Sequence, residues 1–231
     1  MDHFEQIYAS KAREYHRMIA VEDVDGNLLP ALESVASLDG KRILDLGSGT
    51  GRLPLLLGTL PAQIVALDLN FPMLVEQAAQ RKTAGCSGPL VSADMRWLPF
   101  AGKGWDVVIA GWAIGHLRSW FAEDWQNQMS RIFAEMHRVA ASGGALIVLE
   151  TMTTGSTQPA PPTEGLAEYY HWMESEWGFA RQVIQTDYQF TDLQQAVDYT
   201  EFFFGAELAQ MIRQNNWVRL PEWTGVWGKR V

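Results

Sequence analysis

Three glycines at alternate positions mark the first place in this chain where chemistry could occur. Gly47, Gly49 and Gly51 follow the mainly apolar stretch 42–46 and precede a stretch with helical character. A glycine-rich turn between strand and helix lets a ligand approach the backbone, and the N–H groups that start a helix attract a negative group. Asp45 could attract a positive group such as an amine. The alternative is a tight turn without a ligand.

The spacing of these glycines argues against two common nucleotide sites. The dinucleotide fingerprint G-x-G-x-x-G requires a third glycine at a position where this chain has Arg52. The phosphate-binding pattern G-x-x-x-x-G-K-S/T does not occur in the sequence either. A small ligand with a carboxylate therefore fits the turn better than a pyrophosphate or a nucleoside triphosphate.

Acidic residues end the next two apolar runs. Asp68 ends the run that begins at residue 63, where its carboxylate could accept hydrogen bonds from a ribose diol or could cap the following helix. Asp94 ends the run that begins at residue 88 and could accept from a purine amine, while the Met95 N–H could donate to a ring nitrogen. The alternative for Asp94 is an ordinary loop acid.

The end of the fourth apolar run, residues 105–112, brings further candidates. The backbone carbonyls of Gly111 and Trp112 could accept from the amino group of a ligand. His116 follows this run, and its unperturbed pKa of about 6.5 suits a general base. The alternative is a histidine packed beneath a loop, or a reaction driven by positioning alone. His171 is a weaker candidate for the same role.

The elements that must position these residues follow an alternating rhythm. Short runs rich in Val, Ile and Leu alternate with helical stretches, which is typical of parallel strands buried on both faces and joined by right-handed crossovers. The sequence therefore predicts an α/β fold with an open, doubly wound sheet. The predicted strands cover residues 42–47, 63–69, 88–94, 105–112 and 144–150.

The whole chain, residues 1–231, is expected to form one domain. A helical cap over residues 1–40 precedes a core over 41–151, and substrate-side helices and terminal strands occupy 152–231. In that last part, a linker-like segment at 153–162 is followed by predicted elements. These are a helix over 165–177, a long strand over 180–190, one helix over 196–214 and a hairpin-like edge strand over 219–230.

The motifs in this order resemble the class I S-adenosylmethionine-dependent methyltransferases, and most closely the branch of ubiquinone and menaquinone biosynthesis (methyltransferase type 11). The resemblance covers about residues 40–151. It implies a seven-stranded, mostly parallel sheet of order 3-2-1-4-5-7-6 with the last strand antiparallel. It also implies methyl transfer from S-adenosyl-L-methionine to a small-molecule acceptor, with S-adenosyl-L-homocysteine as product. The motifs that carry it are "ILDLGSGTG", "VALDLN", "SADMRWLPF", "WDVVIAGWAIGHL" and "RVAASGGALIVLE".

The resemblance also implies which residues bind the cofactor. The glycine turn would hold the methionine part, the strand-end acid the ribose, and the third strand end together with Met73 the adenine. In this sequence the set is Asp45, Gly47, Ser48, Gly49, Gly51, Asp68, Leu69, Met73, Asp94, Met95, Gly111 and Trp112.

Composition restricts the partners. A formal net charge of −9 disfavours nucleic acid and anionic membranes. No membrane span, export signal or zinc-ligand spacing is visible, and no metal is expected. The single cysteine, Cys86, suits the cytoplasm. The oligomeric state is not indicated.

The acceptor pocket is expected between the N-terminal cap and the helix after the fifth strand. Aromatic residues gather there and could form a wall for a flat or apolar substrate, or could simply pack the caps on the sheet. Aminopropyl transfer and cofactor binding without catalysis remain alternatives to methyl transfer. The aromatic residues are Tyr8, Tyr15, Tyr169, Tyr170, Trp172 and Trp177.

Overall fold

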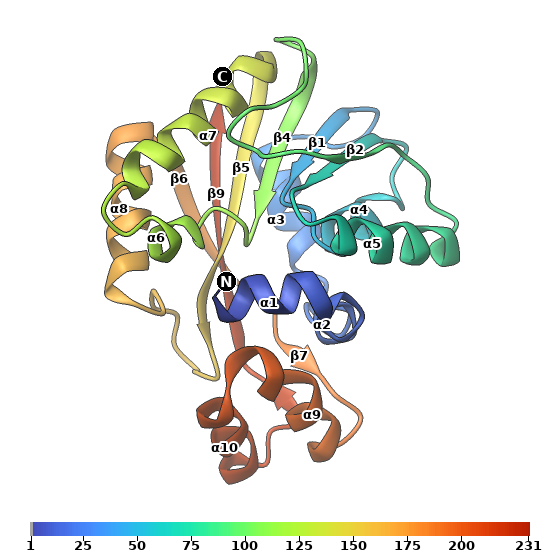
Figure 1. Ribbon diagram of the computed structural model, residues 1–231, viewed down its shortest axis with the longest axis vertical. Coiled ribbons are helices and arrows are strands. Elements are labelled where there is room, and N and C mark those ends of the chain that lie inside the picture. The colour runs from blue at the N-terminus through green and yellow to red at the C-terminus, as the bar shows by residue number, and fades with distance from the viewer. Residues whose placement is uncertain (1) are drawn as a thin grey trace.

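A seven-stranded sheet forms the centre of the protein, with helices on both of its faces (Figure 1). The computed structural model describes residues 2–231. Strand order is β3-β2-β1-β4-β5-β9-β6, and β9 runs antiparallel to both of its neighbours while β1 to β5 are parallel. Because β9 is the seventh strand of this sheet along the chain, the predicted order is confirmed. The strands are β1 (Arg42–Leu46), β2 (Gln63–Asp68), β3 (Leu90–Ser92), β4 (Trp105–Gly111), β5 (Ala140–Thr154), β6 (Ala180–Gln185) and β9 (Glu222–Arg230).

Alternate residues of the strands enter two different cores, one on each face of the sheet. On β1, Leu44 and Leu46 join one core and Ile43 joins the other, and all three are fully buried. The first core lies under α7 (Trp125–Val139) and α8 (Glu164–Trp177), and the second under α3 (Leu28–Val35) and α4 (Arg52–Leu57). Burial on both faces explains why the strands lack polar alternation. α5 (Phe71–Ala84) and the short α6 (Leu117–Trp120) complete the crossover connections.

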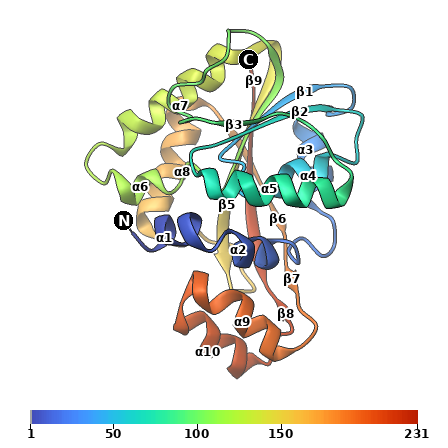
Figure 2. The ribbon, with the colours of Figure 1, turned by 45° about the vertical axis from the view of Figure 1, so that its right-hand side comes forward.

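Two helices of the N-terminal segment lie across the carboxyl ends of the central strands. They are α1 (His3–Ser10) and α2 (Ala12–Ile19), and Figure 2 shows them between the sheet and the pair α9 (Leu193–Phe204) and α10 (Ala206–Asn215). Met18 and Ile19 of α2 are buried against that pair in a separate apolar cluster. The N-terminal helices are therefore held against the sheet by packing on α9 and α10.

Four predictions about the elements are wrong in detail. The helix predicted over 196–214 is broken at Gly205, whose φ of +86° is left-handed and ends α9. The strand predicted over 180–190 ends at Gln185, and the following β7 (Tyr188–Gln189) pairs with β8 (Arg219–Leu220) in a separate two-stranded sheet. The final strand is not at an edge, because β6 lies outside β9. The linker-like segment begins later than predicted, since β5 extends to Thr154.

A substitution of Phe133 tests how much the core under α7 and α8 contributes to the stability of the fold. Its side chain is fully buried and its ring lies 5.0 Å from that of Trp177 and 5.4 Å from that of Phe179. Phe133→Ala should lower the free energy of unfolding by about 3–5 kcal/mol, because it removes apolar contacts and leaves a cavity. Chemical denaturation measures this. Phe71→Ala is the matched control, since Phe71 is 65% exposed, and it should change stability by no more than about 0.5 kcal/mol. Equal effects of the two changes would contradict this description of the core.

Candidate active site

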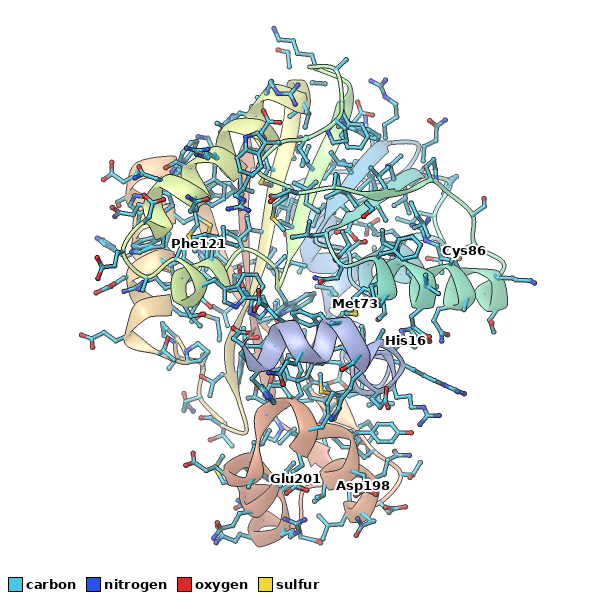
Figure 3. The ribbon with its side chains drawn as sticks, in the orientation of Figure 1. His16, Met73, Cys86, Phe121, Asp198 and Glu201 are labelled. Atoms are coloured by element: carbon cyan, nitrogen blue, oxygen red, sulfur yellow. The ribbon has the colours of Figure 1, made fainter. Side chains whose placement is uncertain are left out.

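A cavity of about 650 Å³ lies at the carboxyl ends of the central strands, beneath α1 and α2. It is lined by His116 and by every residue that was predicted to bind the cofactor except Gly51. Figure 3 shows Met73, which lines the cavity from α5, and Phe121, which lines it from the segment after α6. Residues from well-separated parts of the sequence thus meet at one edge of the sheet, where α/β folds usually bind ligands.

The three glycines of the turn have different physical reasons to be glycine. All three have positive φ angles, of +66° at Gly47, +54° at Gly49 and +97° at Gly51. A Cβ atom on Gly47 would collide with Ala113, and one on Gly51 would lie 2.7 Å from Cγ of Gln77. A Cβ on Gly49 would meet nothing closer than 3.6 Å. Packing within the protein therefore accounts for the first and third glycines, while Gly49 leaves room on the cavity side.

Asp68 holds the turn in place. Its Oδ2 atom accepts a hydrogen bond from the Gly49 N–H at 2.8 Å, and Oδ1 accepts one from the Asn70 N–H at 2.7 Å. Burial raises the pKa of this carboxyl, and the same two hydrogen bonds oppose the rise. The Gly49 N–H is thus already engaged by the protein and is not free for a ligand carboxylate. Asp68 still lines the cavity and keeps acceptor capacity for a ligand hydroxyl.

Asp45 is a buried carboxylate that lines the cavity without a hydrogen-bond donor. The residue is 1% exposed, and neither of its oxygens is hydrogen-bonded within residues 2–231. Burial raises its pKa well above the usual range; Arg81 opposes this rise and Asp68 adds to it. A buried unpaired acid costs stability unless a donor satisfies it. The site is therefore suited to a ligand that brings a cationic or N–H group to Asp45.

Asp94 has a partner that the sequence did not suggest. Both of its oxygens accept from the guanidinium of Arg96, with the shortest contact, from Nη2, at 2.6 Å. Burial opposes but does not outweigh these hydrogen bonds, so that the pKa of Asp94 is lowered. A purine amine at Asp94 would have to share the carboxylate with Arg96.

Arg52 connects the N-terminal cap to the glycine turn. Its guanidinium lies 3.6 Å from the centre of the Trp112 ring, and its Nη2 atom is 2.6 Å from Oε1 of the buried Glu22, just after α2. A second link joins His16 Nδ1 to the buried Thr50 hydroxyl at 3.1 Å. Sequence reasoning treated Arg52 only as a missing glycine, because nothing local indicates a partner at position 22.

His116 lies in the cavity wall and is also packed. Its Nε2 atom is 2.8 Å from the hydroxyl of Tyr8, and its ring stacks on Trp120 with centroids 5.0 Å apart. The indole N–H of Trp120 donates in turn to Asp2, which caps α1. Burial lowers the pKa of His116 to about 4, against the attraction of Asp2. The imidazole is thus neutral near neutral pH.

The expected aromatic wall is only partly present. Tyr8 and Tyr15 line the cavity, but the four aromatic residues of α8 do not; they pack around Phe133 and Trp227 on one face of the sheet. Trp120 and Phe121 take their place, from a segment to which sequence reasoning gave no role. Of the two interpretations of the α8 aromatic residues, the structure shows packing on the sheet and not a wall of the cavity, because α8 packs over the sheet rather than at its carboxyl edge.

The described part of the chain has neither a metal-binding cluster nor a membrane-spanning helix. Residues 2–231 contain no group of three or more His, Cys, Asp or Glu side chains placed to hold a metal ion. None of the helices within them has the length and apolar character needed to cross a bilayer.

Comparisons with known proteins first define the class of fold. The YcgJ protein of Bacillus subtilis superimposes with a TM-score of 0.56 at 16% identity, over 89% of this chain and 98% of that one. Likeness at this identity shows a shared Rossmann-like fold of the methyltransferase kind.

The sequence comparisons then point to the family. Residues 44–148 match the family model described as a methyltransferase domain (type 11), which supports the resemblance to the class I S-adenosylmethionine-dependent methyltransferases. A malonyl-[acyl-carrier protein] O-methyltransferase of Legionella pneumophila is 34% identical over 61% of this chain and 46% of its own length. A demethylmenaquinone methyltransferase of Thermus thermophilus is 32% identical over 48% and 47%, respectively. The chain thus matches about half the length of these curated relatives.

A substitution of Glu150 tests the raised pKa of this buried acid, which accepts a hydrogen bond from the residue before His116. Its Oε1 atom accepts from the Gly115 N–H at 2.8 Å, and burial raises the pKa of Glu150 to about 8. A raised folded-state pKa adds stability below the unfolded value of about 4.3, and that stability is lost as the pH rises towards the folded value. Between about pH 5 and about pH 8, the free energy of unfolding of Glu150→Gln should therefore fall less than that of the wild type. Denaturation at several pH values measures the two slopes, and identical slopes would contradict the raised pKa.

Proposed function

We propose that this protein transfers a methyl group from S-adenosyl-L-methionine to a small-molecule acceptor and releases S-adenosyl-L-homocysteine. The observation that carries the proposal is the single cavity that gathers the glycine turn, Asp45, Asp68 and Asp94 inside the matched domain. The names of the relatives support methyl transfer as the reaction class, and their different acceptors leave the substrate open.

The lining residues suit the parts of this cofactor. The methionine part would lie against Gly49, and its ammonium group would find an unpaired carboxylate at Asp45. Asp68 would accept from the ribose hydroxyls. The adenine would lie between Met73 and the segment that contains Asp94 and Met95. Satisfying Asp45 would remove the cost of its burial, so cofactor binding should stabilise the folded protein.

The electrostatics of the cavity suit a positively charged cofactor. Its lining contains five carboxylates, at Asp2, Glu5, Asp45, Asp68 and Asp94, and two guanidiniums, at Arg52 and Arg96. Both guanidiniums are paired with acids at 2.6 Å. The methylated sulfur of the cofactor, when bound, supplies an activated methyl group, because its leaving group is neutral. The chain must then hold the acceptor in line with that methyl carbon, about 3–3.5 Å away.

We also place the reaction in the cytoplasm, where the cofactor is made and where a free thiol such as that of Cys86 persists. The direct test of the proposed activity is production of S-adenosyl-L-homocysteine by the purified protein in the presence of phenols, quinols, amines and carboxylic acids. Turnover with any of them supports methyl transfer. Binding of the cofactor with no turnover across the panel would favour a protein that only binds it.

Gly49 offers a matched test of where the cofactor lies. Gly49→Ala adds a methyl group on the cavity side of the turn, without a clash inside the protein. The left-handed backbone should cost about 1–2 kcal/mol of stability, and affinity for S-adenosyl-L-methionine should fall at least about tenfold. Calorimetric titration measures the affinity, and thermal unfolding measures the stability.

Gly143→Ala is the control for this change. Gly143 has a similar φ of +76°, lies in β5 outside the cavity, and a Cβ there would meet nothing within 4 Å. It should lose comparable stability while binding the cofactor as the wild type does. Unchanged affinity in folded Gly49→Ala would show that the cofactor does not lie against this turn.

A further inference from the structure

Tyr8 and His116 form a partly buried hydrogen-bonded pair in the wall of the cavity. The Tyr8 hydroxyl and the His116 Nε2 atom are 2.8 Å apart, although the residues are 108 positions apart in the chain. Both side chains line the cavity. The pair exists only because α1 lies across the carboxyl ends of the strands (Figure 1). It is held from several sides, because the His116 ring stacks on Trp120 and its centroid is 5.1 Å from that of Phe4.

The pair is continuous with the turn where the methionine part of the cofactor would lie. A Cβ on Gly49 would be 3.8 Å from Cε1 of Tyr15. The Tyr15 ring meets that of Tyr8 edge to face, with centroids 5.6 Å apart. Tyr8 therefore lies between the glycine turn and His116, on the side of the cavity where an acceptor would approach the cofactor.

Both partners are neutral near neutral pH. Burial raises the pKa of Tyr8 well above its usual value, and burial lowers that of His116. A protonated hydroxyl next to a neutral imidazole can donate to Nε2, and it keeps oxygen lone pairs directed elsewhere. The charged or titratable groups that act on the pair from the neighbouring elements are Asp2 and Tyr15 of the cap, Asp68 at the end of β2 and Glu150 of β5.

We propose that Tyr8 and His116 form a proton relay, in which Tyr8 takes the proton of a neutral O–H or N–H acceptor and passes its own proton to Nε2 of His116. This proposal rests on the methyl transfer proposed above. The acceptor oxygen or nitrogen forms a bond to the methyl carbon, and the carbon–sulfur bond breaks with its electron pair remaining on sulfur. The acceptor proton moves to the Tyr8 oxygen as the Tyr8 proton moves to His116. The products are the methylated acceptor, neutral S-adenosyl-L-homocysteine and an imidazolium at His116.

Charge conservation explains why a weakly basic histidine is suited to this task. Before the reaction a sulfonium charge lies in the cavity, and it disfavours a second positive charge on His116. As the methyl group leaves, that charge disappears, and a proton on His116 restores the net charge of the cavity. Asp2, whose attraction raises the pKa of His116, would stabilise the imidazolium.

The same cavity argues against an acceptor that is already anionic. Arg52 is paired with Glu22 and Arg96 with Asp94, each at 2.6 Å. A carboxylate or phosphate acceptor would therefore find no unpaired guanidinium in the lining, and would lie near Asp2 and Glu5. A neutral hydroxyl or amine avoids this repulsion, and it is also the kind of acceptor that must lose a proton.

Tyr8→Phe tests the relay, because it removes the hydroxyl and keeps the ring. The probes are phenol, 4-nitrophenol and benzoate, with S-adenosyl-L-homocysteine measured as product. For phenol, kcat of the wild type should be nearly independent of pH above about pH 5, and Tyr8→Phe should lower it by roughly 10²–10³ near neutral pH. In the variant, kcat should rise about tenfold per pH unit as more phenolate forms. The loss should be smaller for the more acidic 4-nitrophenol, and benzoate should not be methylated.

Tyr199→Phe is the matched control, since Tyr199 lies on α9 outside the cavity and packs on Phe190. It should leave rate and pH profile unchanged. Cofactor affinity, measured separately by calorimetry, should be the same in wild type and Tyr8→Phe. Failure of the wild type to bind the cofactor would overturn the proposed function itself. Normal binding and turnover with the same pH profile in both proteins would overturn only the relay.

A second measurement needs no acceptor. Nitrogen NMR of ¹⁵N-histidine-labelled protein reports which ring nitrogen of His116 carries the proton, and the signal is assigned by its absence in His116→Gln. The relay requires an unprotonated Nε2 that accepts a hydrogen bond near neutral pH, with a chemical shift that moves in Tyr8→Phe. A neutral ring protonated on Nε2 would overturn the proposal even if none of the probes is a substrate.

Discussion

The left-handed turn at the end of β1 is the constraint on which the site depends. The three glycines at positions 47, 49 and 51 have positive φ angles, and they bring the backbone close to Ala113 on one side and to Gln77 on the other. The Asp68 carboxylate holds the middle of this turn through the Gly49 N–H. Because Asp68 ends the neighbouring strand, the turn and the strand end form one rigid unit. The remaining walls of the cavity are arranged around that unit.

The N-terminal cap is joined to this unit by buried polar contacts rather than by apolar packing alone. The ion pair of Arg52 with Glu22 and the hydrogen bond of His16 with Thr50 both end on residues next to the glycines. Desolvating such an ion pair costs free energy that can exceed the attraction gained, so we interpret the pair as fixing where the cap lies rather than as a source of stability. Trp112, stacked on the guanidinium of Arg52, adds the end of β4 to the same arrangement.

This arrangement leaves two kinds of buried acid with different consequences. Asp45 has no donor within the described residues and is satisfied only if a ligand brings one. Glu150 already accepts from the Gly115 N–H and carries the wall that ends in His116. Asp45 thus suits recognition of a cationic ligand, whereas Glu150 fixes the backbone next to His116 in the cavity wall. Both have raised pKa values for the same reason, which is loss of water on burial.

Local sequence patterns determined the sheet, the glycine turn and the acids at the strand ends. Runs of Val, Ile and Leu specify buried parallel strands wherever they occur, and residues at the carboxyl ends of such strands must meet at one edge. Only the tertiary structure decided which side chains reach that edge from elements outside the sheet. The break at Gly205, the position of α8 over the sheet, and the contacts of Tyr8 with His116 and of Glu22 with Arg52 depend on how the cap and the C-terminal helices pack. Those contacts join residues far apart in the chain, and no periodicity within a single segment encodes them.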